Sequence, residues 1–322
     1  MNRIITLTVN PAIDKSTTVV GMRPNSKLRC APPVFEAGGG GVNVSVVLKE
    51  LGVTSLCAYL AGGPTGTHLE TLLKEVGVPQ QIIPIAAWTR ENLAVTDTTN
   101  NQQYRFGMPG PLVTENEWQG TLEQLDAVLA EGDLLVSSGS LCPGMPTDFY
   151  AQVAAITKKK KVKLILDTSD DALLQGVRAG GVYLLKPNIG ELAKLCDMKS
   201  LSFLELESAA KKLLEAKTCE VLVISLGAQG ALLVAKEIME YIPAPVVHQK
   251  STIGAGDSMV AGMVFALAKG KSLSEMAKFG VACGTAATMT EGTQLCKKKD
   301  AEDLYEWIIN NPSGTSQVVL DA

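Results

Sequence analysis

A short segment in the last third of the chain combines two glycines with one carboxylate. Residues 252–258 read TIGAGDS, and apolar residues at helical spacing follow over 259–268. Backbone N–H groups at the start of a helix lack intrahelical partners and lie at the positive end of the helix dipole, so they attract anions. An anion site that contains a carboxylate suits phosphoryl transfer. The segment is equally typical of a plain loop with Asp257 as helix N-cap, so other segments must decide.

Four consecutive glycines form a second candidate ligand-binding turn. They occupy 38–41 and precede a helix expected over 42–51, with Asn43 at its start. Because glycine has no Cβ, a ligand can approach the backbone closely, although a flexible loop is the alternative. The turn is not a dinucleotide fingerprint, since no clear βαβ unit with an acidic residue ~20 positions later frames it. The chain also lacks the Walker A pattern and the H-R-D and D-F-G segments of protein kinases.

The composition limits the classes of protein to which the chain can belong. Of 322 residues, 46% are hydrophobic and 19% are charged, and the net charge of −4 disfavours general nucleic-acid binding. No apolar run reaches the ~18 residues of a membrane span, and the first residues lead into a strand pattern instead of a signal peptide. We therefore expect a cytoplasmic protein that binds neither membranes nor nucleic acid.

Cysteine and histidine offer little for catalysis. The seven cysteines are scattered without a C-x-x-C pair, so reduced structural thiols are expected. His68 and His248 are the only histidines, which leaves few ligands for a zinc site or a histidine-based triad. The chemistry therefore depends on carboxylates, glycine-rich turns and cations.

Short apolar runs alternate with longer amphipathic segments along most of the chain. This alternation predicts an α/β fold with a mainly parallel sheet covered by helices on both faces. The expected strands are 4–9, 55–60, 133–137, 163–167, 182–185 and 221–225. The expected helices are 42–51, 66–77, 147–160, 189–196 and 204–216, followed by a mainly helical part from 255 that includes 273–289 and 300–309.

Two segments interrupt this alternation. Residues 12–35 are rich in turns and contain no helix pattern, and residues 90–107 contain a hairpin pattern across Thr99, Asn100 and Asn101. We expect a single domain over 1–322, into which 12–35 and 90–107 are inserted as a discontinuous β lid. A lid over the end of a parallel sheet keeps water away from a transferring phosphoryl group.

Four segments in the same order give the chain a resemblance to the PfkB (ribokinase-like) family of carbohydrate kinases over essentially its whole length. They read GGGGVN at 38–43, KPNIGE at 186–191, SLGAQG at 225–230 and STIGAGDS at 251–258. The resemblance implies a ribokinase-like fold and ATP-dependent phosphorylation of a sugar, with ATP and Mg²⁺ as cofactors.

The resemblance also implies the roles of the catalytic and nucleotide-binding residues. Asp257 would be the base, kept ionised by an ordinary carboxyl pKa near ~4 and by the helix dipole. The amides of Gly254, Ala255 and Gly256 would hold phosphoryl oxygens. The remaining implied nucleotide contacts are Lys186, Asn188, Ser225, Gly227 and Gly230.

Two cation sites are implied as well. Asn188 and Glu191, three residues apart at a helix start, suit Mg²⁺ held through water, although their spacing is also that of a capping box and both readings are compatible. Family members often hold a monovalent cation, so the resemblance allows a K⁺ site here. The composition of the chain gives no support for it. The residues implied for it are Ser251, Ile253, Ala287, Thr290 and Gly292.

Residues on the lid side would choose the sugar. The implied substrate contacts are Asp14, Gly39, Gly40, Asn43 and Ser140. Four cations lie on or beside the two inserted segments, namely Lys27, Arg29, Arg90 and Arg105. Arginine forks suit phosphate oxygens, so this set predicts a sugar that already carries a phosphate, although each cation taken alone suits a solvated surface.

Segments 27–30, 88–92 and 104–110 are similar to the minor 6-phosphofructokinase branch of the family. That branch implies fructose 6-phosphate as substrate and a homodimer joined through the lids, with a cation near Arg29 reaching the neighbouring site. Tagatose-6-phosphate kinase and 1-phosphofructokinase are the alternatives, because NPAID at 10–14 is common to these branches, while Cys142 and Gln294 depart from the closest pattern.

Two other functional classes are disfavoured. A dinucleotide oxidoreductase is disfavoured because the chain lacks the fingerprint of that class, and an inactive relative is disfavoured because Asp257 is intact.

Overall fold

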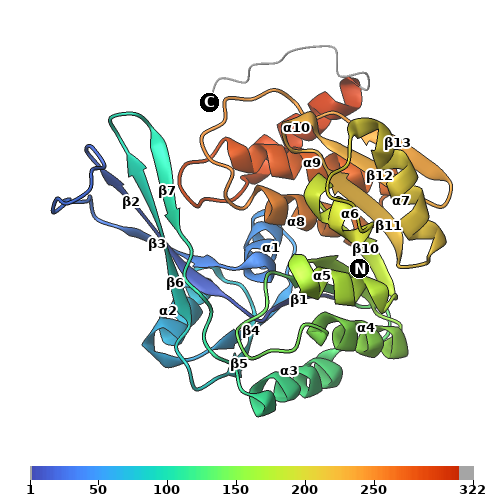
Figure 1. Cartoon of the computed structure of the whole chain (residues 1–322), viewed down its shortest axis with the longest axis horizontal. Helices are drawn as coiled ribbons and strands as arrows, with labels where there is room; N and C mark the ends of the chain where they lie inside the picture. Colours follow the sequence, from blue (N-terminus) through green and yellow to red (C-terminus); the bar gives the residue numbers. More distant parts are fainter. Residues whose placement is uncertain (1, 312–322) are drawn as a thin grey trace.

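The computed structural model describes residues 2–311, and a nine-stranded sheet forms its centre (Figure 1). The strand order is β13-β12-β11-β10-β9-β8-β1-β4-β5, parallel from β5 to β11 and antiparallel from β11 to β13. The strands are β1 (Ile4–Thr8), β4 (Leu56–Ala61), β5 (Gln80–Pro84), β8 (Leu134–Ser138), β9 (Lys163–Asp167), β10 (Val182–Leu185), β11 (Cys219–Ser225), β12 (Ala231–Ala235) and β13 (Ile238–Ile242). The six predicted strands are confirmed, whereas β5, β12 and β13 were not predicted.

Helices cover both faces of this sheet, as predicted. They are α1 (Gly40–Glu50), α2 (Gly63–Val76), α3 (Glu115–Val128), α4 (Phe149–Lys160), α5 (Asp170–Arg178), α6 (Ile189–Leu195), α7 (Leu206–Glu215), α8 (Ala255–Ala268), α9 (Leu273–Thr288) and α10 (Lys298–Asn310). Alternate residues of the central strand point to opposite faces, so Ile4 packs in the core beneath α1, α8, α9 and α10, while Ile5 and Leu7 pack in the core beneath α3 to α7. Only α3 and α5 were not predicted among these helices.

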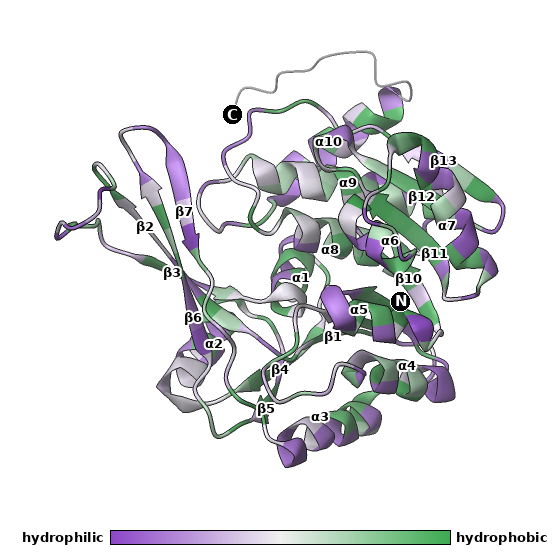
Figure 2. Ribbon diagram, viewed as in Figure 1, coloured by the Kyte–Doolittle hydropathy of each residue, from purple (hydrophilic) through white to green (hydrophobic). Residues whose placement is uncertain are grey.

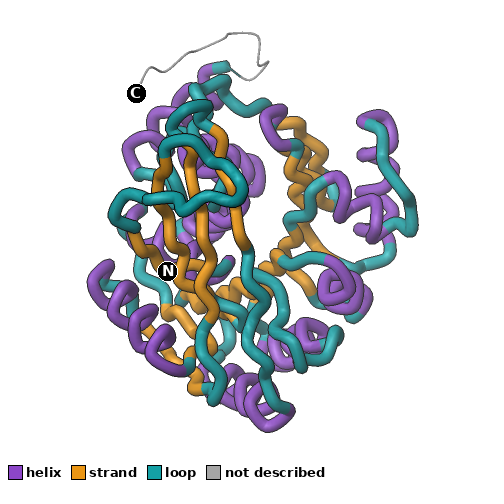
Figure 3. Tube along the Cα trace, turned by 60° about the vertical axis from the view of Figure 1, so that its left-hand side comes forward, coloured by secondary structure: helices purple, strands orange, loops and turns teal. Residues whose placement is uncertain are grey.

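A separate four-stranded sheet, here called the small sheet, stands beside one end of the large sheet (Figures 1 and 3). Its strands are β2 (Ala12–Val19), β3 (Val34–Gly38), β6 (Arg90–Asp97) and β7 (Gln102–Phe106), in the order β3-β2-β6-β7. The prediction that both inserted segments are β structure is confirmed. The parallel pairing of β2 with β6, which joins the two segments, was not predicted.

The hydropathy of the two sheets differs along their strands. Figure 2 shows β11 and β12 as mainly hydrophobic, whereas β7 is hydrophilic along most of its length. The large sheet is buried by helices on both faces, and a strand buried on both faces is a nearly continuous apolar run. Strand β7 of the small sheet therefore carries mainly polar side chains, whereas the strands of the large sheet carry the apolar side chains of the core.

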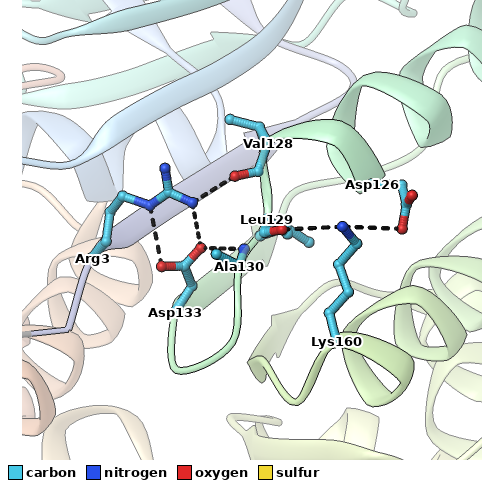
Figure 4. A network of polar contacts seen from close by, with 7 residues as sticks. All are labelled: Arg3, Asp126, Val128, Leu129, Ala130, Asp133 and Lys160. Atoms are coloured by element: carbon cyan, nitrogen blue, oxygen red, sulfur yellow. Dashed lines mark hydrogen bonds and ion pairs between the residues drawn. The ribbon is translucent and has the colours of Figure 1, made fainter.

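A polar network fastens the start of β1 to the segment between α3 and β8 (Figure 4). Arg3 donates from Nε and Nη2 to the two carboxylate oxygens of Asp133, at 3.1 and 2.6 Å, and from Nη2 to the Val128 carbonyl. Lys160 of α4 donates to the Leu129 carbonyl and pairs with Asp126 at 3.5 Å. The network lies at the amino-terminal end of the parallel strands. Ligands of open α/β sheets bind at the opposite end, where the strands have their carboxyl ends.

No helix within residues 2–311 combines the length and the hydrophobicity that crossing a bilayer requires. All seven cysteines are free thiols, and Cys30 is the exposed one.

Candidate active site

Helix α8 begins at the glycine-rich segment that suggested phosphoryl transfer. Gly254 is its N-cap, with φ of +70°, and a side chain there would collide with Leu295. The amides of the first turn, at Ala255, Gly256 and Asp257, have no partner inside the helix. Asp257 is the third residue of the helix and its side chain makes no capping hydrogen bond. The alternative in which Asp257 is the N-cap is therefore wrong.

The start of α1 meets the start of α8. Asn43 in the first turn of α1 donates from Nδ2 to Oδ2 of Asp257 at 2.8 Å, although the two residues are 214 positions apart. The glycine turn allows this approach because a Cβ at 38 would overlap the Asp14 carboxylate, and one at 40 would overlap Ser138. Gly39 has φ of +110° and Gly41 lies against the Leu7 carbonyl. Protein atoms thus occupy the place of a Cβ at each of these glycines, while the backbone of Gly39 and Gly40 stays half-buried and accessible.

The electrostatic surroundings of Asp257 differ from the expectation. Its side chain is partly buried, and loss of hydration together with the nearby Asp167 charge raises its pKa to about 7. The hydrogen bond from Asn43 and the charge of Lys186 act in the opposite direction. The expectation of an ordinary pKa near ~4 is wrong, because the sequence shows neither the burial of the Asp257 carboxyl nor the nearby Asp167 carboxylate.

Lys186 and Asp167 form a buried ion pair beside the start of α8. Lys186 Nζ lies 3.1 Å from Asp167 Oδ1, and the two side chains are 8% and 16% exposed. Burial opposes the charge on Lys186, but Asp167, Glu191 and Asp257 outweigh it and raise the lysine pKa. The sequence interpretation missed Asp167. Its signal was its place at the carboxyl end of a predicted strand, where α/β folds bind ligands.

Asn188 and Glu191 form the capping box of α6. The Asn188 side chain accepts from the Glu191 amide and the Glu191 carboxylate accepts from the Asn188 amide, both at 2.9 Å. Burial raises the pKa of Glu191. The other carboxylate oxygen of Glu191 has no hydrogen bond within the described residues. A carboxylate oxygen is the type of ligand that Mg²⁺ prefers, so this oxygen of Glu191 fits the implied ion.

An apolar cavity of about 300 Å³ adjoins the start of α8. Ser225, Gly227 and Gly230 line it together with Ala255 and Gly256, as the nucleotide assignment expects. An isolated parallel β-bridge between the backbones of Asn188 and Ser225 places the α6 capping box next to this cavity. The sequence interpretation missed its apolar wall, which consists of Ala244, Pro245, Val246, Val247, Met259 and Val281.

The two segments assigned to a monovalent cation lie side by side. Ser251 Oγ donates to the Gly292 carbonyl at 2.8 Å, and the Ile253 amide donates to Ser251 Oγ at 3.2 Å. Thr290 Oγ1 lies 2.8 Å from the Ala287 carbonyl oxygen and 2.6 Å from the Gln294 carbonyl oxygen. These contacts gather carbonyl and hydroxyl oxygens, the ligands that hard cations prefer.

A smaller cavity of about 230 Å³ separates the small sheet from the start of α8. Asp14, Asn92, Arg105, Ile253 and Thr293 are among its lining residues. Asn92 donates to Asp14 at 2.8 Å, while burial raises the Asp14 pKa. Asn92 was not predicted, because only the pairing of β2 with β6 places it opposite Asp14.

Contacts across this cavity hold the small sheet against the helical part. Arg105 Nη2 donates to Thr252 Oγ1 at 3.1 Å, and Thr293 donates to Glu36. Arg90 donates from Nη1 to the Met108 carbonyl and from Nη2 to the Asn10 carbonyl, both at 3.0 Å. Neither Glu36 nor Thr293 was predicted. The small sheet thus closes one side of the space in front of Asp257.

The four predicted cations do not form one cluster within this chain. Arg90 and Arg105 border the site, but Lys27 and Arg29 are exposed on the loop between β2 and β3, which extends away from α8 in Figure 1. Neither makes a hydrogen bond or ion pair to another of the described residues. Lys27 and Arg29 lie apart from Arg90 and Arg105 within this chain, because the loop between β2 and β3 leads outward. Ser140 is exposed and its Oγ lies 3.1 Å from Asn10 Nδ2.

Comparison with known proteins agrees with this geometry. The model of the pfkB family carbohydrate kinases matches residues 4–300. ATP-dependent 6-phosphofructokinase isozyme 2 of Escherichia coli is 40% identical over 96% of this chain and 99% of its own length. The enzyme of the same name from Mycobacterium tuberculosis H37Rv is 41% identical over 94% of this chain and 89% of its own length.

Relatives with the alternative activities are more distant. A 1-phosphofructokinase of Borreliella burgdorferi is 35% identical, and a tagatose-6-phosphate kinase of Staphylococcus epidermidis is 28% identical. Phosphofructokinase-2 of Escherichia coli, solved in complex with potassium, superposes with a TM-score of 0.93 at 39% identity and covers 96% of this chain and all of its own. The same enzyme has also been solved in a tetrameric inhibited form. The ribokinase-like fold is therefore confirmed, and this chain belongs to the pfkB family of carbohydrate kinases.

Proposed function

We propose that the protein transfers the γ-phosphoryl group of ATP to fructose 6-phosphate and releases fructose 1,6-bisphosphate and ADP. The observation that carries this proposal is the position of Asp257 at the start of α8, where Gly256 lines the apolar cavity and Ile253 lines the smaller cavity with Asp14 and Arg105. The names of the relatives at 40% and 41% identity support the same acceptor.

Asp257 acts as the general base. As the acceptor oxygen bonds to the γ-phosphorus, the bond from that phosphorus to the bridging oxygen breaks, ADP leaves and the hydroxyl proton passes to the carboxylate. Its pKa of about 7 makes Asp257 a stronger base than an ordinary carboxylate, yet a large part of it is ionised at neutral pH.

The groups around Asp257 hold the charge of the phosphoryl oxygens. The amides of Gly254, Ala255 and Gly256 and the ammonium of Lys186 are fixed before the reaction, so little reorganisation is needed. Asn188 and Glu191 would hold Mg²⁺ through water, and when bound the ion neutralises charge between the nucleotide phosphates. Ser225, Gly227 and Gly230 contact the nucleotide.

The acceptor binds on the side of the small sheet, which acts as a lid. Asp14 and Asn43, with the backbone of Gly39 and Gly40, contact sugar hydroxyls. Arg90, Arg105 and Ser140 contact the existing phosphate, for which guanidinium forks are well suited. K⁺ bound by Ser251, Ile253, Ala287, Thr290 and Gly292 would fix the loop that leads into α8, which predicts that activity depends on a monovalent cation.

The exposed loop between β2 and β3 joins two copies through their lids. Lys27 and Arg29 are exposed and have no partner within the described part of this chain, which supports a role in the neighbouring site. Sedimentation of the purified protein tests this arrangement. We expect a homodimer. We also expect the Lys27→Ala variant to remain a dimer and to have a raised KM for fructose 6-phosphate. A monomer with full activity would contradict this arrangement.

One assay tests the proposed function directly. ADP release is measured with fructose 6-phosphate, tagatose 6-phosphate, fructose 1-phosphate and free fructose under identical conditions, with Asp257→Asn as the matched control. The highest kcat/KM is expected with fructose 6-phosphate. A higher kcat/KM with another acceptor would replace the substrate, and equal ADP release without any acceptor would refute sugar kinase activity.

A further inference from the structure

Asn10 lies two residues after the end of β1, and both its side chain and its backbone carbonyl make hydrogen bonds. Its side chain is 5% exposed, and Nδ2 lies 3.1 Å from Ser140 Oγ and 3.2 Å from the Leu141 carbonyl oxygen. Its own carbonyl accepts a hydrogen bond from Arg90. The side-chain Oδ1 is buried without a hydrogen-bond partner and lies over Gly110, where a Cβ would overlap it.

The Leu141 carbonyl fixes the direction of the Asn10 amide. A carbonyl oxygen can only accept, so the amide nitrogen and not the amide oxygen must face it. The same nitrogen contacts Ser140 Oγ, which must therefore accept as well. A hydroxyl group has one proton, and here that proton points away from Asn10. Because Ser140 is exposed, the proton is available to an oxygen of a ligand.

The backbone of Asn10 acts on the neighbouring cation. With the Met108 carbonyl it accepts one N–H from each terminal nitrogen of Arg90, so the plane of the guanidinium is set and one N–H of each nitrogen is left over. One buried residue thus contacts both the hydroxyl group and the cation that the proposed function assigns to the acceptor phosphate.

We infer that Asn10 is a positioning residue of the acceptor pocket, which makes the Ser140 hydroxyl an obligatory hydrogen-bond donor to a phosphate or hydroxyl oxygen of the substrate. The inference rests on the proposed function for the identity of that substrate. Asn10 does not touch the reacting atoms. It acts through Ser140, so the loss of Asn10 changes acceptor binding and leaves the nucleotide side unaffected.

Steady-state kinetics of four proteins test this inference, namely wild type, Asn10→Ala, Ser140→Ala and the double variant. Asn10→Ala is expected to raise KM for fructose 6-phosphate about tenfold, as for one lost hydrogen bond to a charged group, with kcat and KM for ATP nearly unchanged. In the Ser140→Ala background the same substitution is expected to change KM less than about twofold. An equal effect in both backgrounds would overturn the inference.

The Asn10→Asp substitution is a second test, because it should reverse the direction of the hydrogen bond between residue 10 and Ser140. A carboxylate can only accept, so Ser140 would donate to it and lose its proton for the ligand, and the added charge repels the substrate phosphate. The increase in KM is expected to exceed that of Asn10→Ala. An Asn10→Asp variant with the KM of wild type would overturn the inference.

A readout without substrate separates this inference from the proposed function. If wild type phosphorylates no sugar phosphate, the proposed function fails, but the hydrogen bond still predicts non-additive shifts in Tm among the four proteins. Asn10→Ala is then expected to lower Tm less in the Ser140→Ala background than in wild type. Additive shifts would overturn the inference.

Discussion

Helices α1 and α8 both begin at glycines, yet the two helix starts differ in what surrounds them. Around Gly38 to Gly41 the space is taken by Asp14, Ser138 and the backbone of β1. At α8 a Cβ at Gly254 would also meet Leu295, but at Gly256 the one neighbour among the described residues outside the helix is Lys186 Nζ, 3.6 Å from the place of a Cβ. Similar sequence signals therefore produce a close-packed joint at α1 and an accessible anion site at α8. The joint positions Asn43, and the anion site carries Asp257.

Adding one methyl group at each helix start should separate the two roles. Gly256→Ala is expected to lower kcat by about 10²-fold, the loss typical when a group that stabilises transition-state charge is displaced, with Tm unchanged. Gly41→Ala places its Cβ 2.8 Å from the Leu7 carbonyl and should cost about 1–3 kcal/mol of unfolding free energy. Kinetics and denaturant unfolding of both variants check this contrast. Equal loss of stability at both positions would contradict it.

The cation opposite the start of α8 should affect only the acceptor. Arg105→Ala removes the contact with Thr252 and a proposed phosphate ligand, so KM for fructose 6-phosphate is expected to rise about tenfold. KM for ATP should stay within about twofold, because Arg105 lines the smaller cavity and not the apolar cavity. Lys236→Ala, on the β12–β13 turn, is the matched control. Equal changes in both KM values would count against the phosphate role.

Asn43 at the start of α1 should lower the pKa of Asp257 through a single hydrogen bond. Since Asn43 lowers the pKa of Asp257, its replacement by Ala raises that pKa and moves the acid limb of the kcat/KM profile to higher pH. Because Asn43 is also a proposed sugar contact, the midpoint of the profile and not its height is the measurement. A midpoint that stays at the wild-type value, or moves to lower pH, would show that Asn43 does not act on Asp257.

The contrast between the helix starts also shows what the sequence could predict. The strands of the large sheet and the order of the four motifs follow from local patterns, because a buried parallel strand is a continuous apolar run. Helix α3 was missed because Gly120 and many polar residues weaken its periodicity, and β5 because it begins with two glutamines and ends in Pro84. Such elements depend on the packing of neighbours more than on their own residues.

The site shows the same division. Asp257, Lys186 and the glycines were found because they lie in short motifs, whereas Asp167 and Asn92 reach the site only through strand pairing. The raised pKa of Asp257 could not be predicted for the same reason, since it depends first on burial by the fold and then on Asp167, which is 90 positions away in the sequence. The position of the loop with Lys27 and Arg29 likewise depends on how β2 and β3 pair.

The central claim is that Asp257 takes the proton of the acceptor hydroxyl. Its most direct test is the rate of fructose 1,6-bisphosphate formation by wild type and Asp257→Asn, with ATP and fructose 6-phosphate affinities measured on the same samples by calorimetry. The variant is expected to bind both ligands with affinities like those of wild type and to lose about 10²–10⁴-fold in kcat. Turnover within about threefold of wild type would contradict the claim.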